Sequence, residues 1–176
     1  MSIKKKKGDY KRALEYYNKT LSIWKKIFSE NDLDIAMCLN NIGCLYENEK
    51  KYLEALEYHQ KALIIKNFHL PNNHLNLSVT YNNLATIYDC IGQLDLALEH
   101  FNLLLKIKSK SLLINHLDIR LTLENIGFIN EMKGDFSQAK LFYEKAALIR
   151  HHILSSTHCD VIQIEQDIKR ILMKIK

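Results

Sequence analysis

Residues 38–66, CLNNIGCLYENEKKYLEALEYHQKALIIK, carry the pattern that decides the fold. The pattern returns in residues 80–108, TYNNLATIYDCIGQLDLALEHFNLLLKIK, and in residues 122–150, TLENIGFINEMKGDFSQAKLFYEKAALIR. The three segments start at positions 38, 80 and 122, so the offset is the same both times, and they align without a gap. Self-similarity at a fixed period of about 20 to 50 residues indicates a stacked array of small units.

Each unit is predicted to contain two amphipathic helices joined by a short turn. Apolar residues recur at steps of three and four within each half of the pattern, which is the period of a helix with one buried face. Residues 48–51 form the first turn, and Lys50 fills the slot that holds Gly92 and Gly134 in the later units. Glycine adopts the left-handed conformation needed there without steric cost, so we expect slight strain at Lys50.

Small residues also recur inside the predicted helices. Gly43, Ala85 and Gly127 occupy one slot of the first helix, and Ala55 and its equivalents occupy one slot of the second. A glycine in mid-helix costs about 1 kcal/mol relative to alanine, so it needs a packing reason. We predict that it allows the partner helix to approach closely.

The repeat register predicts a single repeat domain over residues 1–176. Its predicted parts are a partial repeat that keeps only the second helix (8–32), three full repeats (33–74, 75–116 and 117–158) and a C-terminal capping helix (159–176). Gly8 fills the turn slot, so Met1–Lys7 is the last turn of an otherwise missing helix and the chain is expected to start inside an array. Lys169 replaces the small residue of the last segment, which suits a capping helix and a C-terminal end of the array near Lys176.

Composition favours helices and excludes several classes of protein. The chain has 176 residues with one proline and five glycines, too few breakers for many short strands. The formal charge of +5 comes from scattered residues with one basic run, Lys4–Lys7, so we predict no nucleic-acid partner. No apolar run reaches about 18 residues and none follows Lys4–Lys7, so we predict no membrane partner and no signal peptide. The four cysteines show no C-x-x-C spacing, which favours reduced thiols and a cytoplasmic protein.

The two-helix unit with a small residue in each helix resembles the tetratricopeptide repeat. The family's slots are filled in the first full repeat by Leu39, Ile42, Gly43, Tyr46, Tyr52, Ala55, His59 and Ala62. The long repeat, the Asn-Asn-Leu/Ile-Gly/Ala core and the histidine before each first helix are similar to the kinesin-light-chain type. The resemblance covers about residues 8–176. It implies an all-α fold, a tetratricopeptide-type α-solenoid in which helix hairpins form a right-handed superhelix.

The resemblance also implies a non-catalytic scaffold whose first helices line a concave groove for an extended peptide or a partner helix. The groove-facing positions are Met37, Asn40, Asn41, Cys44, Val79, Asn82, Asn83, Thr86, Leu121, Glu124, Asn125 and Phe128, and the acidic residues of the next turn are Glu47, Asp89 and Glu131. An amide can pair with a peptide backbone whatever the side chains are, so Asn41, Asn83 and Asn125 form a hypothetical binding ladder. The alternative is that these asparagines bridge adjacent helices.

Charge predicts the kind of partner. The groove-facing positions carry no Lys or Arg, and Glu47, Asp89 and Glu131 follow them, which favours a neutral to basic protein or peptide segment with apolar anchors. Resemblance to kinesin light chain implies a cargo adaptor in a microtubule-motor complex, although the coiled coil that would bind a heavy chain is absent here. The alternative function is an accessory repeat segment of a larger enzyme or signalling protein.

No catalytic residue, cofactor or metal site is predicted. The sequence has no G-x-S-x-G, no phosphate-binding glycine loop and no H-E-x-x-H. His74, His116 and His158 recur with the repeat, but contacting helices lie about 8–10 Å apart whereas zinc ligands lie about 2 Å from the metal, so these histidines cannot share an ion. We predict that they start the helices that follow. The histidines and Cys159 in residues 151–159 suggest adventitious metal binding at most, and Trp24 is predicted to be a core residue.

Overall fold

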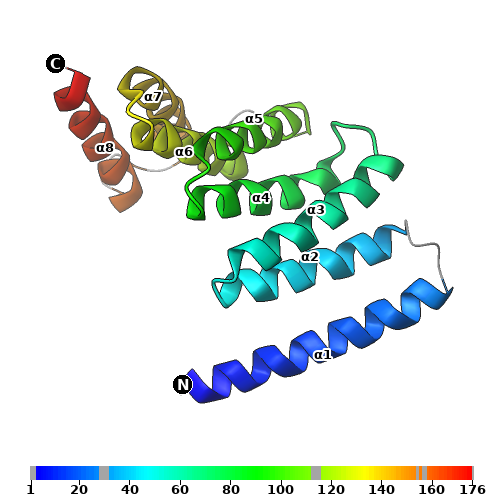
Figure 1. The fold of residues 1–176 in the computed structure, drawn as a ribbon. Coiled ribbons are helices and arrows are strands. Elements are labelled where there is room, and N and C mark those ends of the chain that lie inside the picture. The colour runs from blue at the N-terminus through cyan, green and yellow to red at the C-terminus, as the bar shows by residue number, and fades with distance from the viewer. Residues whose placement is uncertain (1–2, 28–31, 112–115, 154, 156–157, 176) are drawn as a thin grey trace. The chain divides into compact units, whose positions relative to one another are not determined.

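The computed structural model describes residues 3–27, 32–111, 116–153, 155 and 158–175, and every regular element in these ranges is a helix (Figure 1). The elements are α1 (Ile3–Ile27), α2 (Leu33–Asn48), α3 (Tyr52–His69), the 3-10 helix η1 (Leu75–Leu77), α4 (Ser78–Cys90), α5 (Leu94–Ser111), α6 (Leu117–Met132), α7 (Phe136–Ile153) and α8 (Cys159–Ile175). The all-α prediction is confirmed. The chain divides into two compact units, unit 1 (residues 1–91) and unit 2 (residues 92–176).

Unit 1 is built on the hairpin of α2 and α3. Helix α1 packs on α2, while α4 packs on α3 and more lightly on α2. The core of the hairpin holds Ile35, Ala36, Leu39, Ala62 and Ile65, and Leu21, Trp24 and Tyr58 pack against it. The prediction that Trp24 is a core residue is confirmed.

Helix α1 is longer than the repeat register predicts. The register places a turn at Gly8, after the last turn of another helix, but α1 runs without a break from Ile3 to Ile27. The predicted turn at Gly8 is therefore wrong. Lysine is a good helix former, and one glycine costs a helix only about 1 kcal/mol, which is too little to end it. Met1 and Ser2 lie outside the described residues.

The turns inside the repeats have the predicted left-handed residue. The φ angles are 60° at Lys50, 75° at Gly92 and 81° at Gly134. Behind Lys50, the N–H of Lys51 donates to the carbonyl of Tyr46 at 2.9 Å, and the N–H of Lys50 donates to the carbonyl of Glu47 at 2.8 Å. This pair of bonds is a Schellman motif, which satisfies the last carbonyls of α2. The expected strain at Lys50 is confirmed, because an L-residue at positive φ is disfavoured.

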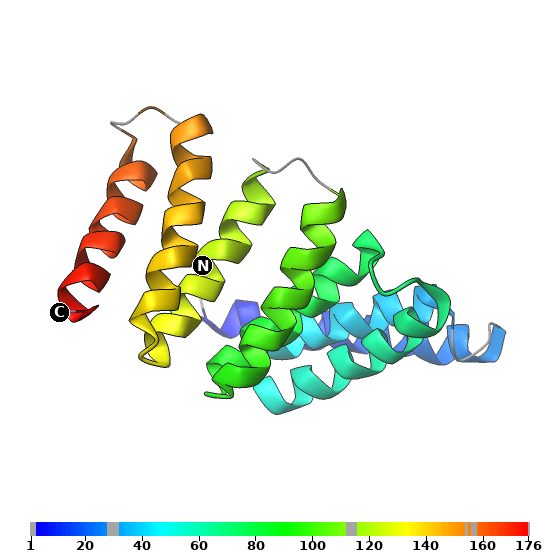
Figure 2. The same cartoon turned by 90° about the horizontal axis from the view of Figure 1, so that it is seen from above.

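Unit 2 is built on the hairpin of α6 and α7, with α5 packed on α6 and α8 packed on α7. The two ribbon views show α6, α7 and α8 side by side (Figures 1 and 2). The core holds Ile119, Leu123, Ala139, Tyr143, Ala146, Ala147, Ile149, Ile164 and Ile171. Helix α8 buries Val161, Ile164 and Ile171, while Lys169 is exposed.

The mid-helix glycines lie where the two helices of a hairpin touch. A Cβ atom built on Gly43 would stand 2.6 Å from Nε2 of His59, and one on Gly127 would stand 2.8 Å from Cδ1 of Tyr143. Both distances are far below a van der Waals contact. The predicted packing role of these glycines is confirmed.

The repeated histidines start the helices that follow them. Nδ1 of His74 accepts from the backbone N–H of Asn76, and the same bond links His116 to Asp118 and His158 to Asp160. Asp32 fills the same slot before α2, where its carboxylate accepts from the N–H of Asp34. Side-chain acceptors at this position satisfy N–H groups that the first turn of a helix leaves without partners. The prediction for His74, His116 and His158 is confirmed.

Candidate functional site

Asn40 lies inside unit 1 rather than on its surface. Only 5% of its surface is exposed, its Nδ2 donates to Oγ1 of Thr80 at 2.8 Å, and its Oδ1 lies 2.8 Å from Nδ1 of His59. Both ends of the amide are used by neighbouring helices. We therefore leave Asn40 out of the candidate surface.

The other predicted positions of α2 reach the surface of unit 1. Met37 is 55% exposed, Asn41 is exposed, and Cys44 and Glu47 are half-buried. Burial raises the pKa of Glu47. A cationic ligand stabilises the charged form of a partly buried carboxylate more than that of a fully hydrated carboxylate.

Helix α4 adds a second row to unit 1. Val79 is 60% exposed, and Asn82, Asn83, Thr86 and Asp89 are half-buried. Nδ2 of Asn83 donates to Sγ of Cys44 at 3.5 Å, so this asparagine bridges α4 and α2 as the alternative interpretation supposes. Burial also raises the pKa of Asp89.

In unit 2, Glu124 is committed to an internal ion-pair network. Its Oε1 lies 2.7 Å from Nη1 of Arg120 and 2.8 Å from Nε of Arg150, and both arginines are buried. Arg150 also donates to the backbone carbonyl of Asp160, which ties α7 to the start of α8. The network of Glu124 and Arg150 therefore links α6, α7 and α8, and Glu124 offers little to a ligand.

Glu131 is covered by α8. Its carboxylate accepts from Nη2 of Arg170 at 2.8 Å, from Nζ of Lys174 at 3.0 Å and from the hydroxyl of Tyr143 at 3.2 Å. Although burial opposes the charged form, these three donors lower the pKa of Glu131. The sequence predicts that Glu131 adds negative charge to the groove, whereas two cations from α8 balance this charge.

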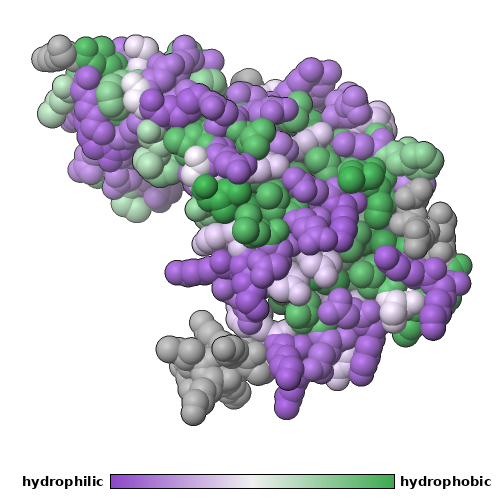
Figure 3. All heavy atoms as spheres, in the orientation of Figure 1, coloured by the Kyte–Doolittle hydropathy of each residue, from purple (hydrophilic) through white to green (hydrophobic). Residues whose placement is uncertain are grey.

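Two candidate surfaces remain, one in each unit. The unit 1 surface consists of Met37, Asn41, Cys44, Glu47, Val79, Asn82, Asn83, Thr86 and Asp89 on α2 and α4. The unit 2 surface consists of Leu121, Asn125 and Phe128 on α6, where Leu121 is 44% and Phe128 is 45% exposed. Each combines exposed apolar side chains with amides. Figure 3 shows hydrophobic and hydrophilic side chains next to one another on one face of the molecule.

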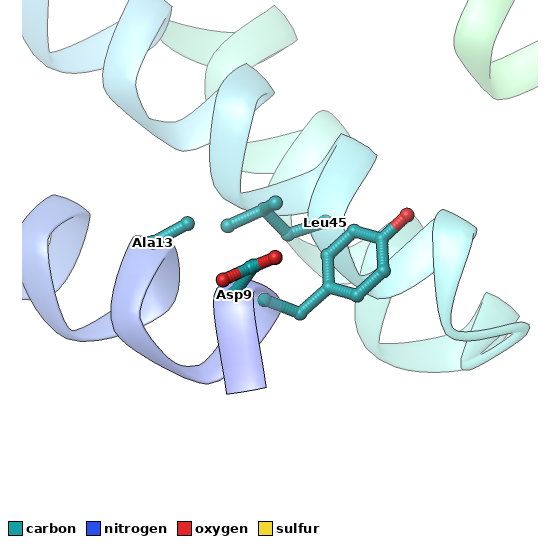
Figure 4. Close-up of a pocket in the computed structure, with 4 residues that line it drawn as sticks. Asp9, Ala13 and Leu45 are labelled. Atoms are coloured by element: carbon teal, nitrogen blue, oxygen red, sulfur yellow. The ribbon is translucent and has the colours of Figure 1, made fainter. Parts of the chain in front are cut away.

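A shallow pocket lies elsewhere, between α1 and α2. It is lined by Asp9, Tyr10 and Ala13 of α1 and by Leu45 of α2, and Figure 4 shows Asp9 and Ala13 opposite Leu45. The repeat register gave no signal for it, because the register assigned the residues around Gly8 to a turn. The pocket is a seam in the contact between two helices, with one carboxylate at its edge.

These helix hairpins, with their close-packed glycines and left-handed turns, define a helical repeat protein. A tetratricopeptide repeat family profile matches residues 2–67, 45–110 and 76–149. The chain belongs to the tetratricopeptide repeat family. A comparison with curated proteins found no match.

Solved structures with the same fold include repeats from kinesin light chains. The nearly identical repeats assigned to a Podosopora anserina kinesin light chain share 18% identity with this chain at a TM-score of 0.83, over 96% of this chain and 80% of that one. BtubC (BKLC) from P. vanneervenii shares 18% identity at a TM-score of 0.85, over 97% of this chain and 68% of that one. MamA protein shares 17% identity at a TM-score of 0.68, over 97% and 76%. These similarities confirm the tetratricopeptide-type fold.

Among the described residues, none of the helices combines the length and the apolar character needed to cross a membrane.

Proposed function

We propose that this chain is a non-catalytic scaffold that binds a protein or peptide segment on the exposed faces of its first helices. One observation carries the proposal. Met37, Val79 and Leu121 occupy the same repeat slot, and they are 55%, 60% and 44% exposed although each is apolar. Apolar side chains that recur on exposed faces are typical of interaction sites, whereas single ones need no explanation. Tetratricopeptide repeats are typical of scaffolds that act through protein–protein interaction.

The chemistry of the unit 1 surface favours a partner with apolar anchors and a neutral to basic charge. Within the described part of unit 1, Glu47 and Asp89 form no ion pair, and burial raises the pKa of both carboxyls. A Lys or Arg side chain of a ligand would stabilise their charged forms. The exposed amide of Asn41 offers a donor and an acceptor to a peptide backbone.

The finer role that we propose is a cargo adaptor of the kinesin-light-chain type, working in the cytoplasm. The length of the repeat and the fold shared with the kinesin-light-chain repeats support this role. In this role the chain would work as part of a microtubule-motor complex. The test is capture by the intact chain of a cargo protein that also co-purifies with a microtubule motor, which this role predicts and an unrelated scaffold would not give.

Peptide titrations test the binding surface itself. Peptides selected from a random library on the intact chain would be titrated against the double variant Met37→Ala/Val79→Ala. Loss of two apolar anchors at about 1–2 kcal/mol each should weaken binding at least tenfold.

The matched control is Leu53→Ala/Ile64→Ala, two exposed apolar residues of α3 at 70% and 68%. This control should bind as the parent does. Equal affinity of the α2/α4 variant and the parent, or a larger loss in the α3 control, would place the binding surface elsewhere.

A further inference from the structure

A buried hydrogen-bond network in unit 1 determines which nitrogen of His59 carries the proton. Nζ of Lys66 donates to Oγ1 of Thr80 at 2.9 Å, and Nδ2 of Asn40 donates to the same oxygen at 2.8 Å. The amide oxygen of Asn40 therefore faces Nδ1 of His59 at 2.8 Å, and that nitrogen donates. The other ring nitrogen, Nε2, is left with a lone pair.

Nε2 of His59 is an unsatisfied buried polar atom. His59 has 0% of its surface exposed, and among the described residues Nε2 has no hydrogen-bond partner. Burial and the nearby charge of Lys66 lower the pKa of His59 to about 4, so the imidazole is neutral at pH 7. Buried polar atoms in folded proteins almost always have a partner, and an exception needs an explanation.

Two further metal-binding side chains lie close to the imidazole of His59. Cys44 and Glu47 lie one helical turn apart on the same face of α2. One ligand atom from each of Cys44, Glu47 and His59 lies within 4.8 Å of the other two. Two helices therefore bring a thiol, a carboxylate and an imidazole together at the edge of the unit 1 surface.

Gly43 packs on the His59 ring without blocking this nitrogen. A Cβ atom on Gly43 would lie 2.6, 2.7 and 2.9 Å from Nε2, Cε1 and Cδ2 of the ring. Three nearly equal distances place the glycine over the face of the imidazole. The lone pair of Nε2 lies in the ring plane, so the glycine does not occupy its direction.

Unit 2 shows what another repeat places in these slots. Tyr143 occupies the slot of His59 two repeats later, and Glu131 occupies the slot of Glu47. In unit 2 the Tyr143 hydroxyl donates directly to Glu131 at 3.2 Å. Histidine is shorter than tyrosine, so in unit 1 the corresponding direct bond is missing and a gap separates the imidazole from the carboxylate.

We propose that Cys44, Glu47 and His59 form a Zn²⁺ site, with Sγ, a carboxylate oxygen and Nε2 as ligands and water in the fourth position. Thiolate, imidazole and carboxylate are the three ligand types that zinc uses, and three protein ligands with water form a known open arrangement. The ion would be balanced by the charges of the thiolate and the carboxylate. Binding releases the thiol proton of Cys44 to solvent.

Asn40 supports the proposed histidine ligand through the other ring nitrogen, Nδ1. A zinc-bound histidine commonly donates its second N–H to an oxygen that fixes the tautomer and the ring orientation. The bond from Nδ1 of His59 to Asn40 has this form, and Thr80 holds the amide in place. The contacts that would orient the histidine ligand are therefore already present. The site could not be recognised from the sequence. Its three ligands lie on two helices and occur together in one repeat, so they form no recurring pattern.

Cobalt titration of the full chain tests the proposal. Co²⁺ replaces Zn²⁺ in such sites, and its thiolate bond gives a near-ultraviolet charge-transfer absorption. We expect this band at one Co²⁺ per chain, its loss on addition of Zn²⁺, and a higher melting temperature with Zn²⁺ than with EDTA. Cys44→Thr, His59→Phe and Glu47→Gln should each weaken binding at least tenfold, and Cys44→Thr should remove the band.

The controls use residues that the chain already carries in these slots. Thr86 and Phe101 are the counterparts of Cys44 and His59 in the next repeat, so both variants place a residue that the repeat accommodates, and the helical signal in circular dichroism checks their folding. Cys159→Ser removes the thiol of the other three-residue group, His158, Cys159 and Asp160. It should leave the band unchanged.

Two results would overturn the proposal. One is a band that survives Cys44→Thr and disappears in Cys159→Ser. The other is equal Zn²⁺ affinity of the parent and His59→Phe. In that case a water molecule, and not a metal ion, would bridge His59 and Glu47 in the parent.

Discussion

His59 links the packing of unit 1 to pH. Burial and Lys66 lower its pKa from 6.5 to about 4, so the unfolded chain binds a proton that the folded chain does not bind. The free energy of unfolding should therefore fall as the pH falls from about 6.5 to about 4. The loss from this residue between pH 7 and pH 5 is about 2 kcal/mol.

Urea denaturation at pH 7 and pH 5, with EDTA present, measures this effect. Because His59→Phe removes the titrating group, the variant should lose about 2 kcal/mol less than the parent between the two pH values. The raised pKa values of Glu47 and Asp89 act in the opposite direction, but both carboxyls are present in both proteins. The same pH dependence in the two proteins would contradict the assignment of the acid sensitivity to His59.

Among the described turns, Lys50 is the one L-residue at positive φ, at 60° against 75° for Gly92 and 81° for Gly134. Lys50→Gly should raise the free energy of unfolding by up to about 1 kcal/mol, because relief of the left-handed strain exceeds the entropy that glycine adds to the unfolded chain. Denaturant titration measures the change. Lys51→Gly, at a residue with φ of −89°, is the control and should destabilise.

At the scale of the helix, the start of each repeat depends on one side-chain acceptor. His116 holds the N–H of Asp118 at 3.1 Å. His116→Ala should lower the free energy of unfolding by about 1 kcal/mol, the usual effect of losing an N-cap. His116→Asp should retain stability, because Asp32 makes the same bond before α2 at 2.8 Å. Thermal or urea denaturation compares the three proteins, and an unaffected alanine variant would show that the bond contributes nothing.

The helices of the repeats could be predicted from the sequence because local signals agree there. The periodic apolar residues, the glycines at positive φ and the histidines at helix starts all point to the same hairpins. The extent of α1 could not be predicted in the same way. The register treated Gly8 as a turn, but a glycine ends a helix only where tertiary contacts turn the chain back, and α1 continues through it.

The candidate site was less predictable, since its residues find partners on other helices. Asn40 bonds with Thr80 of α4 and His59 of α3, and Glu131 bonds with Arg170 of α8. A repeat pattern gives the helix face of such residues but does not give the side chains that meet them. Asn41 and Asn125, which depend only on their own helix face, are exposed as the pattern predicts.

For the whole molecule, membership of the tetratricopeptide repeat family is typical of scaffolds for protein interaction, and the exposed residues form the surfaces that we propose for it. The apolar residues of the shared slot recur in unit 1 and unit 2. The raised pKa values of Glu47 and Asp89 belong to unit 1, whereas Glu131 of unit 2 is paired with α8. We therefore expect the basic part of a ligand to contact Asp89 of unit 1, since Glu47 is a proposed zinc ligand.

Amide hydrogen exchange with and without a selected peptide tests the central claim most directly. The proposal predicts slower exchange in α2, α4 and α6, with α3 and α7 changed much less. Met37→Ala/Val79→Ala should reduce the protection of α2 and α4 at the same peptide concentration. Protection confined to α3 and α7, or to the seam between α1 and α2, would contradict binding on the first helices.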